Sequence, residues 1–216
     1  MIARLIVAAA LASLTACADA AGQRQAQSTK PTYDKETGRL KELAYDATTN
    51  GRADTWTDMD GARPLRSRVD RDDDGKIDRW EYYDEQRRLV KVGFSRRADG
   101  TPDAWAFSGD DGKVDRIELS SARDEQKIDR IEYYDTTRAK PDGQGALIRA
   151  EADTNQDGRI DQWETYQDDA LRSIAYDENR DGTPDRRLTY AGASLVAIES
   201  EPDASGRFTK HRNIEQ

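Results

Sequence analysis

The sequence predicts an all-β protein, built as an antiparallel meander of about six hairpins that repeat roughly every 24 residues. Three observations predict this fold. An aspartate-rich phrase recurs along the chain, every tryptophan occupies one position relative to that phrase, and short aromatic segments alternate with turns. A period in this range indicates an array in which each unit buries its apolar residues against its neighbours.

The repeat is defined by one aspartate in each unit, and the steps between these aspartates are 24, 25, 26, 32 and 24 residues. The six aspartates are Asp54, Asp78, Asp103, Asp129, Asp161 and Asp185. Two residues later come Trp56, Trp80, Trp105, Ile131, Trp163 and Arg187, so all 4 tryptophans of the chain share one position. The longest step contains residues 136–145, whose composition predicts a lengthened turn.

Each unit reads as strand, turn, strand and loop. Residues 80–83 and 131–134 are aromatic segments, residues 84–88 form a polar turn, and residues 89–94 and 171–176 are second apolar segments. Alternation with period two, in segments rich in β-branched and aromatic residues, is typical of strands. Turn residues every ten to twelve positions are typical of hairpins. About twelve strands are expected.

The loops carry a pattern of oxygen-bearing side chains. In residues 70–81 such side chains stand at positions 1, 3, 5, 9 and 12, with glycine at 6 and isoleucine at 8, and residues 153–164 repeat the pattern. Two unit charges 4 Å apart repel by about 4 kcal/mol at an effective dielectric near 20. Because several carboxylates converge in each loop, a counterion is needed. All-oxygen ligation on a flexible loop favours Ca²⁺ over zinc, copper or magnesium.

These two segments resemble EF-hand calcium loops. The resemblance implies side-chain ligands, one backbone carbonyl, one aspartate that holds a water, and a final bidentate glutamate. In the first segment these are Asp70, Asp72, Asp74, Lys76 (carbonyl), Asp78 (water) and Glu81. In the second they are Asp153, Asn155, Asp157, Arg159 (carbonyl), Asp161 (water) and Glu164. The role of the final glutamate depends on the flanking structure, since a strand sends alternate side chains to opposite faces.

The other loops keep less of the pattern. A third candidate site keeps Asp177, Asn179, Asp181 and Asp185 but has Leu188 at position 12. Residues 46–57 keep Asp46, Thr48, Asn50 and Asp54 but end on Thr57. Residues 95–106 and 121–132 place Arg97 and Arg123 at position 3, and Gln126 replaces the turn glycine in the second. We interpret these last two segments as structural turns that hold metal poorly or lack it.

Tandem helical EF-hands are the alternative fold. The segments that would form their entering helices contain helix breakers: Gly61 and Pro64 before one loop, and Pro141, Gly143 and Gly145 before the other. The hairpin array is therefore favoured.

The first residues predict export and lipid attachment. Arg4 precedes a short apolar stretch that is too short to span a bilayer, and residues 14–17 read Leu-Thr-Ala-Cys. This ending resembles the bacterial lipobox, which implies that Cys17 is lipidated and becomes the mature N-terminus. We expect a signal peptide at 1–16, the lipidated cysteine with a disordered tether at 17–32, and the repeat domain at 33–216. Ala18 follows the cysteine, which favours the outer membrane over the inner membrane.

The expected function is that of a calcium-binding, membrane-anchored lipoprotein of the cell envelope, with Ca²⁺ in a structural role and an unknown protein or glycan as partner. A net charge of −9 argues against nucleic acid. No enzyme is expected: His211 is the only histidine, and no serine or cysteine has a base partner in the sequence pattern. The alternatives are a calcium-dependent docking or assembly module similar to the dockerins, and a glycan hydrolase based on paired carboxylates.

Overall fold

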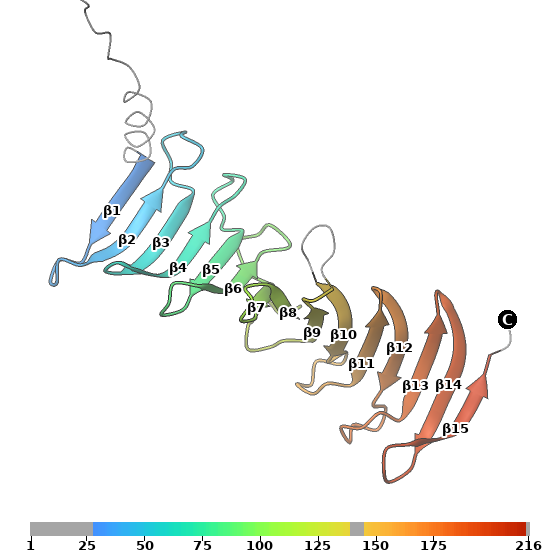
Figure 1. The fold of residues 1–216 in the computed structure, drawn as a ribbon. Helices are drawn as coiled ribbons and strands as arrows, with labels where there is room; N and C mark the ends of the chain where they lie inside the picture. The colour runs from blue at the N-terminus through green and yellow to red at the C-terminus, as the bar shows by residue number, and fades with distance from the viewer. Residues whose placement is uncertain (1–27, 139–144, 215–216) are drawn as a thin grey trace, which may run out of the picture.

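The computed structural model describes residues 28–138 and 145–214, which form one antiparallel sheet of 15 strands in chain order (Figure 1). This confirms the predicted all-β meander, and no helix flanks a loop in the described residues, so the tandem helical EF-hand is wrong. The strands are β1 (Thr29–Tyr33), β2 (Leu40–Tyr45), β3 (Thr55–Asp60), β4 (Arg63–Val69), β5 (Arg79–Tyr83), β6 (Leu89–Phe94), β7 (Ala104–Ser108), β8 (Val114–Leu119), β9 (Arg130–Asp135), β10 (Ala146–Ala152), β11 (Gln162–Gln167), β12 (Ala170–Tyr176), β13 (Arg186–Ala191), β14 (Ser194–Pro202) and β15 (Phe208–Asn213).

The six predicted units correspond to β3–β14, and three strands lie outside them. Strands β1 and β2 form a hairpin before the first aspartate loop, and β15 follows a short turn, Asp203 to Arg207, that lacks the loop pattern. Residues 29–32 belong to β1, where β2 gives their backbone groups partners, although they were expected to be part of the tether. Cys17, the expected signal peptide and the rest of the tether lie outside the described residues.

The two edges of the sheet carry different connections. The tight turns that follow β1, β3, β5, β7, β11 and β13 lie along one edge, and the aspartate loops that follow β2, β4, β6, β8, β10 and β12 lie along the other. The hairpins closed by tight turns have a register shift close to the turn, such as those at Asp58/Met59, Tyr82/Tyr83 and Thr165/Tyr166. Such bulges increase the local twist of paired strands, and the ribbon in Figure 1 twists along its length.

One face of the sheet carries the tryptophans in a single row across the strands. The register aligns Ala44, Trp56, Arg68, Trp80, Gly93, Trp105, Glu118, Ile131, Glu151, Trp163, Ala175, Arg187, Glu199 and His211. Gly93 stands between two tryptophans, and a Cβ at this position would lie 3.4 Å from the Trp105 ring. Trp105 is 2% exposed and Trp80 is 9% exposed, so the core of this single layer lies in the middle of the array.

The same face stacks cations on aromatic rings. Lys91 lies 4.3 Å from the ring centroid of Tyr82, Arg116 lies 4.1 Å from that of Phe107, and Arg149 lies 3.9 Å from that of Tyr133. The long side chains cover ring surface that a second layer of structure would otherwise bury.

The opposite face carries the residues at position 12 of the predicted loops. The register aligns Thr57, Ser67, Glu81, Val92, Ala106, Ile117, Glu132, Ala150, Glu164, Ile174 and Leu188. The position-12 residues are therefore strand residues, three residues beyond the last aspartate of each loop.

Strands β1 and β15, at the two ends of the described sheet, each pair with one neighbouring strand and carry residues that oppose further pairing. Strand β1 contains Lys30 and Pro31, and β15 contains Lys210, His211 and Arg212. Lysine and proline on an edge strand oppose pairing with another sheet. Within the described residues there is also no helix of the length and apolar character that crossing a membrane requires.

Candidate metal centre

The aspartate loops share one backbone frame. In the Asp70 loop (residues 70–78), the N–H of Asp78 donates to the carbonyl of Val69 at 2.9 Å, which closes the loop on itself. The N–H of Asp70 donates to the carbonyl of Asp54 in the preceding loop at 2.8 Å. The second bond recurs from Ser95 to Asp78, Ser120 to Asp103, Asp153 to Asp129 and Asp177 to Asp161. Each of these loops is therefore hydrogen-bonded to the loop before it.

In the Asp70 loop, the carboxylates at positions 1 and 9 accept hydrogen bonds from the backbone of the same loop. The Asp70 carboxylate accepts the N–H of Gly75 at 2.8 Å, and the Asp78 carboxylate accepts the N–H of Arg71 at 2.7 Å. Gly75 has φ of 91°, a conformation that L side chains rarely adopt, which explains the glycine at position 6. Side-chain acceptors of this kind organise aspartate turns without any ion.

The Asp70 loop nevertheless brings three carboxylates together. One ligand oxygen each from Asp70, Asp72 and Asp78 lies within 4.8 Å of the other two. Asp70 is 4% exposed, and its Oδ1 is buried and accepts no hydrogen bond from the described residues. A buried polar atom without a partner is costly, and a cation among the three aspartates would supply one. The donor set fits Ca²⁺, which takes carboxylate oxygens together with carbonyls and waters.

The remaining predicted ligands of this segment lie elsewhere. Asp74 accepts the N–H of Lys76 at 2.8 Å, and this bond lowers the pKa of Asp74 although slight desolvation opposes it. Glu81 lies on β5, where it accepts hydrogen bonds from Arg79 at 2.7 Å and Tyr83 at 2.6 Å. The structure therefore does not bring Asp74 or Glu81 into the cluster of three. For Glu81 the reason is that the chain is already extended at this residue.

The Asp153 loop (residues 153–161) satisfies its own oxygens more fully. Asp153, 6% exposed, accepts the N–H groups of Asp157 at 3.1 Å and Gly158 at 2.8 Å. Asp161 accepts the amide of Asn155 at 2.9 Å, together with the N–H and the hydroxyl of Thr154, both at 2.9 Å. In this loop, therefore, hydrogen-bond donors already contact the carboxylates of Asp153 and Asp161, which the sequence predicts as metal ligands. Asp157 accepts the N–H of Arg159 at 3.0 Å.

Glu164, the predicted last ligand of that segment, belongs to an ion-pair network on the strands. Arg130 donates to its two oxygens at 3.0 and 2.8 Å, and Tyr166 and Gln162 donate at 2.5 and 2.6 Å. Burial opposes ionisation, but the hydrogen bonds from Arg130 and Tyr166 outweigh it, so the pKa of Glu164 is lowered. Sequence reasoning missed this network. Its signal is a cation or amide, then glutamate, then tyrosine at alternate positions, as in residues 79–83, 130–134 and 162–166.

The Asp177 loop (residues 177–185) resembles the Asp153 loop. Asp177 accepts N–H groups from Arg180 at 2.7 Å, Asp181 at 3.2 Å and Gly182 at 2.7 Å. Asp185 accepts the backbone N–H and the side-chain amide of Asn179 at 2.9 and 2.8 Å. All four predicted residues of this loop are thus close in the fold, with backbone and amide donors distributed among them.

In residues 95–106, where the ligand pattern is incomplete, arginine side chains contact the position-9 aspartate. Asp103 is 1% exposed, and its Oδ1 accepts the N–H of Arg96 at 2.9 Å and the Arg96 guanidinium at 3.2 Å. The guanidinium of Arg97 lies 3.9 Å from its Oδ2. Two arginine side chains therefore place positive charge beside Asp103 in this loop.

The next loop begins one residue earlier than the sequence predicts. Ser120, not Ser121, makes the inter-loop bond to Asp103, at 3.0 Å. Its hydroxyl donates to the carbonyl of Lys127 at 2.7 Å and accepts the N–H of Asp124 at 3.1 Å. Ser120 is 0% exposed and takes the place of the position-1 aspartate. The loop holds one extra residue, which fixed spacing in the sequence cannot reveal.

Comparisons with known proteins do not assign this chain to a family. No protein-family model matches the sequence, and no curated protein matches it. Solved structures with similarity include a crystal structure of TarM, with 11% identity, a TM-score of 0.33, and coverage of 47% of this chain and 21% of TarM. A mutant of S. aureus TarM in complex with Fondaparinux, alpha-GlcNAc-glycerol and UDP gives 10% identity and the same TM-score and coverage. This chain thus spans about a fifth of the TarM chains, and the likeness carries no argument for function.

Proposed function

We propose that this protein is a calcium-binding, lipid-anchored protein of the cell envelope, in which structural Ca²⁺ holds a β-sheet that acts as a binding or scaffold surface. The observation that carries the calcium proposal is the Asp70 loop, where oxygens of Asp70, Asp72 and Asp78 converge within 4.8 Å and Asp70 Oδ1 is buried without a partner. The Asp153 and Asp177 loops are weaker candidates for Ca²⁺ binding, because N–H and amide donors of the same loops already bond to their carboxylates.

Charge repulsion supports the same conclusion. Three carboxylates this close repel one another by about 4 kcal/mol for each pair 4 Å apart at an effective dielectric near 20. The N–H groups of Arg71 and Gly75 offset part of that repulsion. A divalent cation at the point of convergence would attract all three carboxylates, and this attraction would outweigh the repulsion between them.

A structural role for the ion fits the fold better than a sensing role. Calcium sensors open a pair of helices when they bind the ion, whereas each loop here joins two strands of a continuous sheet. The Asp70 loop is bonded to the sheet through Val69 and to the preceding loop through Asp54. An ion would therefore fix a corner of the sheet. Modules of this kind outside the cytoplasm bind Ca²⁺ at about 10⁻⁴–10⁻³ M.

The membrane anchor rests on the sequence. The apolar stretch before Cys17 and the lipobox-like residues 14–17 support lipidation, and Ala18 after the cysteine favours the outer membrane. The sheet would then project from the membrane surface, with the cysteine ahead of β1. Lipid attachment would supply the anchor if two acyl chains are present, because two chains together hold a soluble domain at a membrane, whereas one chain binds only marginally.

A residue-resolved Ca²⁺ titration by NMR tests the metal centre. The amide protons of Gly75, Gly158 and Gly182 each bond to the position-1 carboxylate of their own loop. We expect the Gly75 amide to shift saturably, with a Kd of about 10⁻⁴–10⁻³ M. The double variant Asp70→Asn, Asp72→Asn should abolish that shift and leave the Gly158 and Gly182 responses unchanged.

The matched control is Asp84→Asn, which removes an aspartate from a turn at the opposite edge, where Asp84 bonds Arg88. This variant should titrate like the wild type. A Gly75 amide that stays in place at about 10 mM Ca²⁺, well above the expected Kd range, would refute the proposed site. Equal shifts with Mg²⁺ would refute its calcium selectivity.

A further inference from the structure

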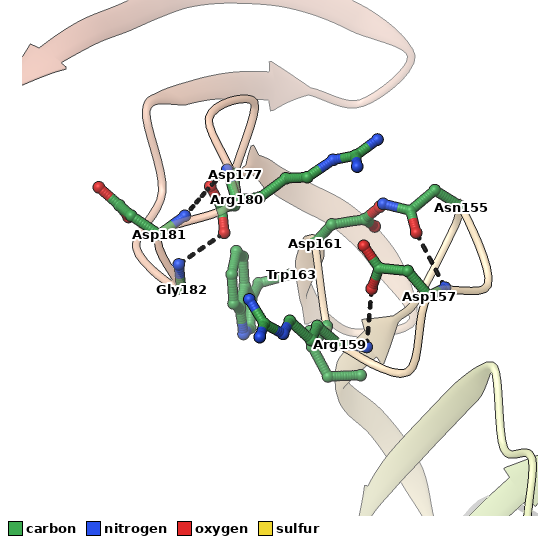
Figure 2. Close-up of a pocket in the computed structure, with 10 residues that line it drawn as sticks. Asn155, Asp157, Arg159, Asp161, Trp163, Asp177, Arg180, Asp181 and Gly182 are labelled. Carbon is green, nitrogen blue, oxygen red and sulfur yellow. Dashed lines mark hydrogen bonds between the residues drawn. The ribbon is translucent and has the colours of Figure 1, made fainter.

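We propose that the pocket between the Asp153 and Asp177 loops binds one sugar ring of a neutral glycan, with Trp163 as its stacking platform. The pocket has a volume of about 400 Å³, within the range of small-molecule sites. Figure 2 shows the Trp163 indole between the two loops, with Asp157 and Asp161 on one side and Asp177 and Gly182 on the other.

Trp163 differs from the tryptophans in the middle of the row. Trp105 and Trp80 are 2% and 9% exposed and serve the core, whereas Trp163 is only half-buried and lines a pocket. Its neighbour on β12 in the same row is Ala175, whose single methyl group leaves the side of the indole uncovered. A flat apolar ring accessible beside polar loops suits the C–H face of a pyranose, which stacks on aromatic rings.

The polar groups of the pocket carry both signs of charge. Arg159 and Arg180 line it together with the carboxylates of Asp157, Asp161, Asp177 and Asp181. An anionic ligand such as a phosphate would meet four carboxylates, and a cationic side chain would meet two guanidinium groups. Hydroxyl groups donate and accept, so a neutral polyhydroxylated ring can pair with donors and acceptors alike. This mixture selects a sugar over a peptide cation or a nucleotide.

Bonding capacity remains on the lining residues. Asp157 Oδ1 accepts the N–H of Arg159, while Asp157 Oδ2 accepts no hydrogen bond from the described part of the chain. The guanidinium groups of Arg159 and Arg180 likewise make no ion pair with any described residue, whereas those of Arg130, Arg149 and Arg187 do. Among the described residues, two guanidinium groups without an ion pair and one carboxylate oxygen without a donor therefore line this pocket together with the indole of Trp163.

The inference rests on the proposed binding role of the sheet and names the partner class, but it does not require the Asp70 metal centre. Its test therefore uses a different readout. Tryptophan fluorescence and calorimetry of the full chain would be followed during titration with maltohexaose, cellohexaose and chitohexaose. Hexalysine and an oligogalacturonate serve as the cationic and anionic probes.

We expect at least one neutral hexasaccharide to bind with a Kd of about 0.1–1 mM, and Trp163→Ala to weaken it at least tenfold. Arg159→Ala and Asp157→Asn should weaken it several-fold. Arg71→Ala, a loop arginine outside the pocket, is the matched control and should bind like the wild type.

Three results would overturn the inference. One is the absence of binding by every neutral hexasaccharide at about 10 mM, ten times the weakest expected Kd. The second is binding that Trp163→Ala leaves intact. The third is Trp163-dependent binding of hexalysine or oligogalacturonate alone, which would assign the pocket to another class of partner. If Trp163→Ala fails to fold by circular dichroism, unchanged affinity in both Arg159→Ala and Asp157→Asn overturns it.

Discussion

At the residue scale, the glutamate at position 12 shows how one side chain can fit two explanations. Glu164 has the spacing of a calcium ligand, yet in the fold Arg130 and Tyr166 hold it on a strand. Glu81 pairs with Arg79 and Tyr83 in the same manner. The spacing of a motif identifies which residues are near in sequence. It does not tell whether the chain is still turning or already extended at the last one.

The Glu164 network has a defined pH dependence. Because the pKa of Glu164 is lowered in the folded state, its contribution to stability is present above its unfolded pKa of about 4.3 and is lost as the pH falls through the folded pKa. We expect Glu164→Gln to reduce the free energy of unfolding at pH 7 by about 1–3 kcal/mol. The difference from wild type should shrink below about pH 4, as measured by urea unfolding across pH.

Glu178→Gln is the comparison variant for this experiment. Glu178 pairs with Arg186 at 2.5 Å, but both side chains are about half exposed, so its loss should have little effect. If both variants lost the same free energy, or if the Glu164→Gln deficit persisted undiminished into acid, the network would not stabilise the sheet as described.

At the element scale, strands with alternating aromatic and β-branched residues can be predicted from the sequence, whereas a strand that depends on its pairing partner cannot. Strands β5, β6, β9 and β12 were evident because aromatic and β-branched residues alternate there between turns. Strand β1 was missed because Thr29–Tyr33 is polar and contains proline, and its strand conformation depends on pairing with β2. The Asp70 cluster was predicted in part, since Asp70, Asp72 and Asp78 converge. The donors that occupy the Asp153 loop arise from its folded geometry.

The loop glycines provide a test of element geometry. Gly158 has φ of 88°, and nothing lies within 4 Å of a Cβ placed there, so only the backbone conformation disfavours a side chain. We expect Gly158→Ala to lower the free energy of unfolding by about 1–2 kcal/mol, measured by urea denaturation. Gly158→Asn should cost less, because asparagine tolerates positive φ. Equal stability of the wild type and Gly158→Ala would contradict this account of the loop.

At the scale of the whole molecule, the sheet depends on its loops because no second layer of described structure covers either face. Among the described residues, buried apolar side chains are few: Trp80, Val92, Ala104, Trp105 and Ala106 lie on β5–β7, and Ala146, Ala150 and Ala152 lie on β10. Each loop is hydrogen-bonded to the one before it along one edge. Ions at this edge would therefore stabilise corners that the thin core supports weakly.

Calcium removal should loosen the array. Binding to the folded state adds about 1.4 kcal/mol when free Ca²⁺ is ten times the Kd. For a domain of this size, that corresponds to a rise in Tm of about 3–6 °C. We expect excess EGTA to lower the Tm by this amount and to reduce the near-ultraviolet tryptophan signal. The Asp70→Asn, Asp72→Asn variant should lose most of the increment. Superimposable melting curves with Ca²⁺ and with EGTA would contradict a structural role for the ion.

The pairing of every strand with its neighbours in chain order also determines how such a sheet can form. Sheets usually fold slowly, because distant segments must close long loops before they gain contacts. Here hairpin closure and short-loop closure create every strand pair, so the sequence separation between partners stays small from β1 to β15. Folding can begin at any hairpin and spread in both directions, one strand at a time. A fifteen-stranded β-protein would then have the low contact order more often associated with helical bundles.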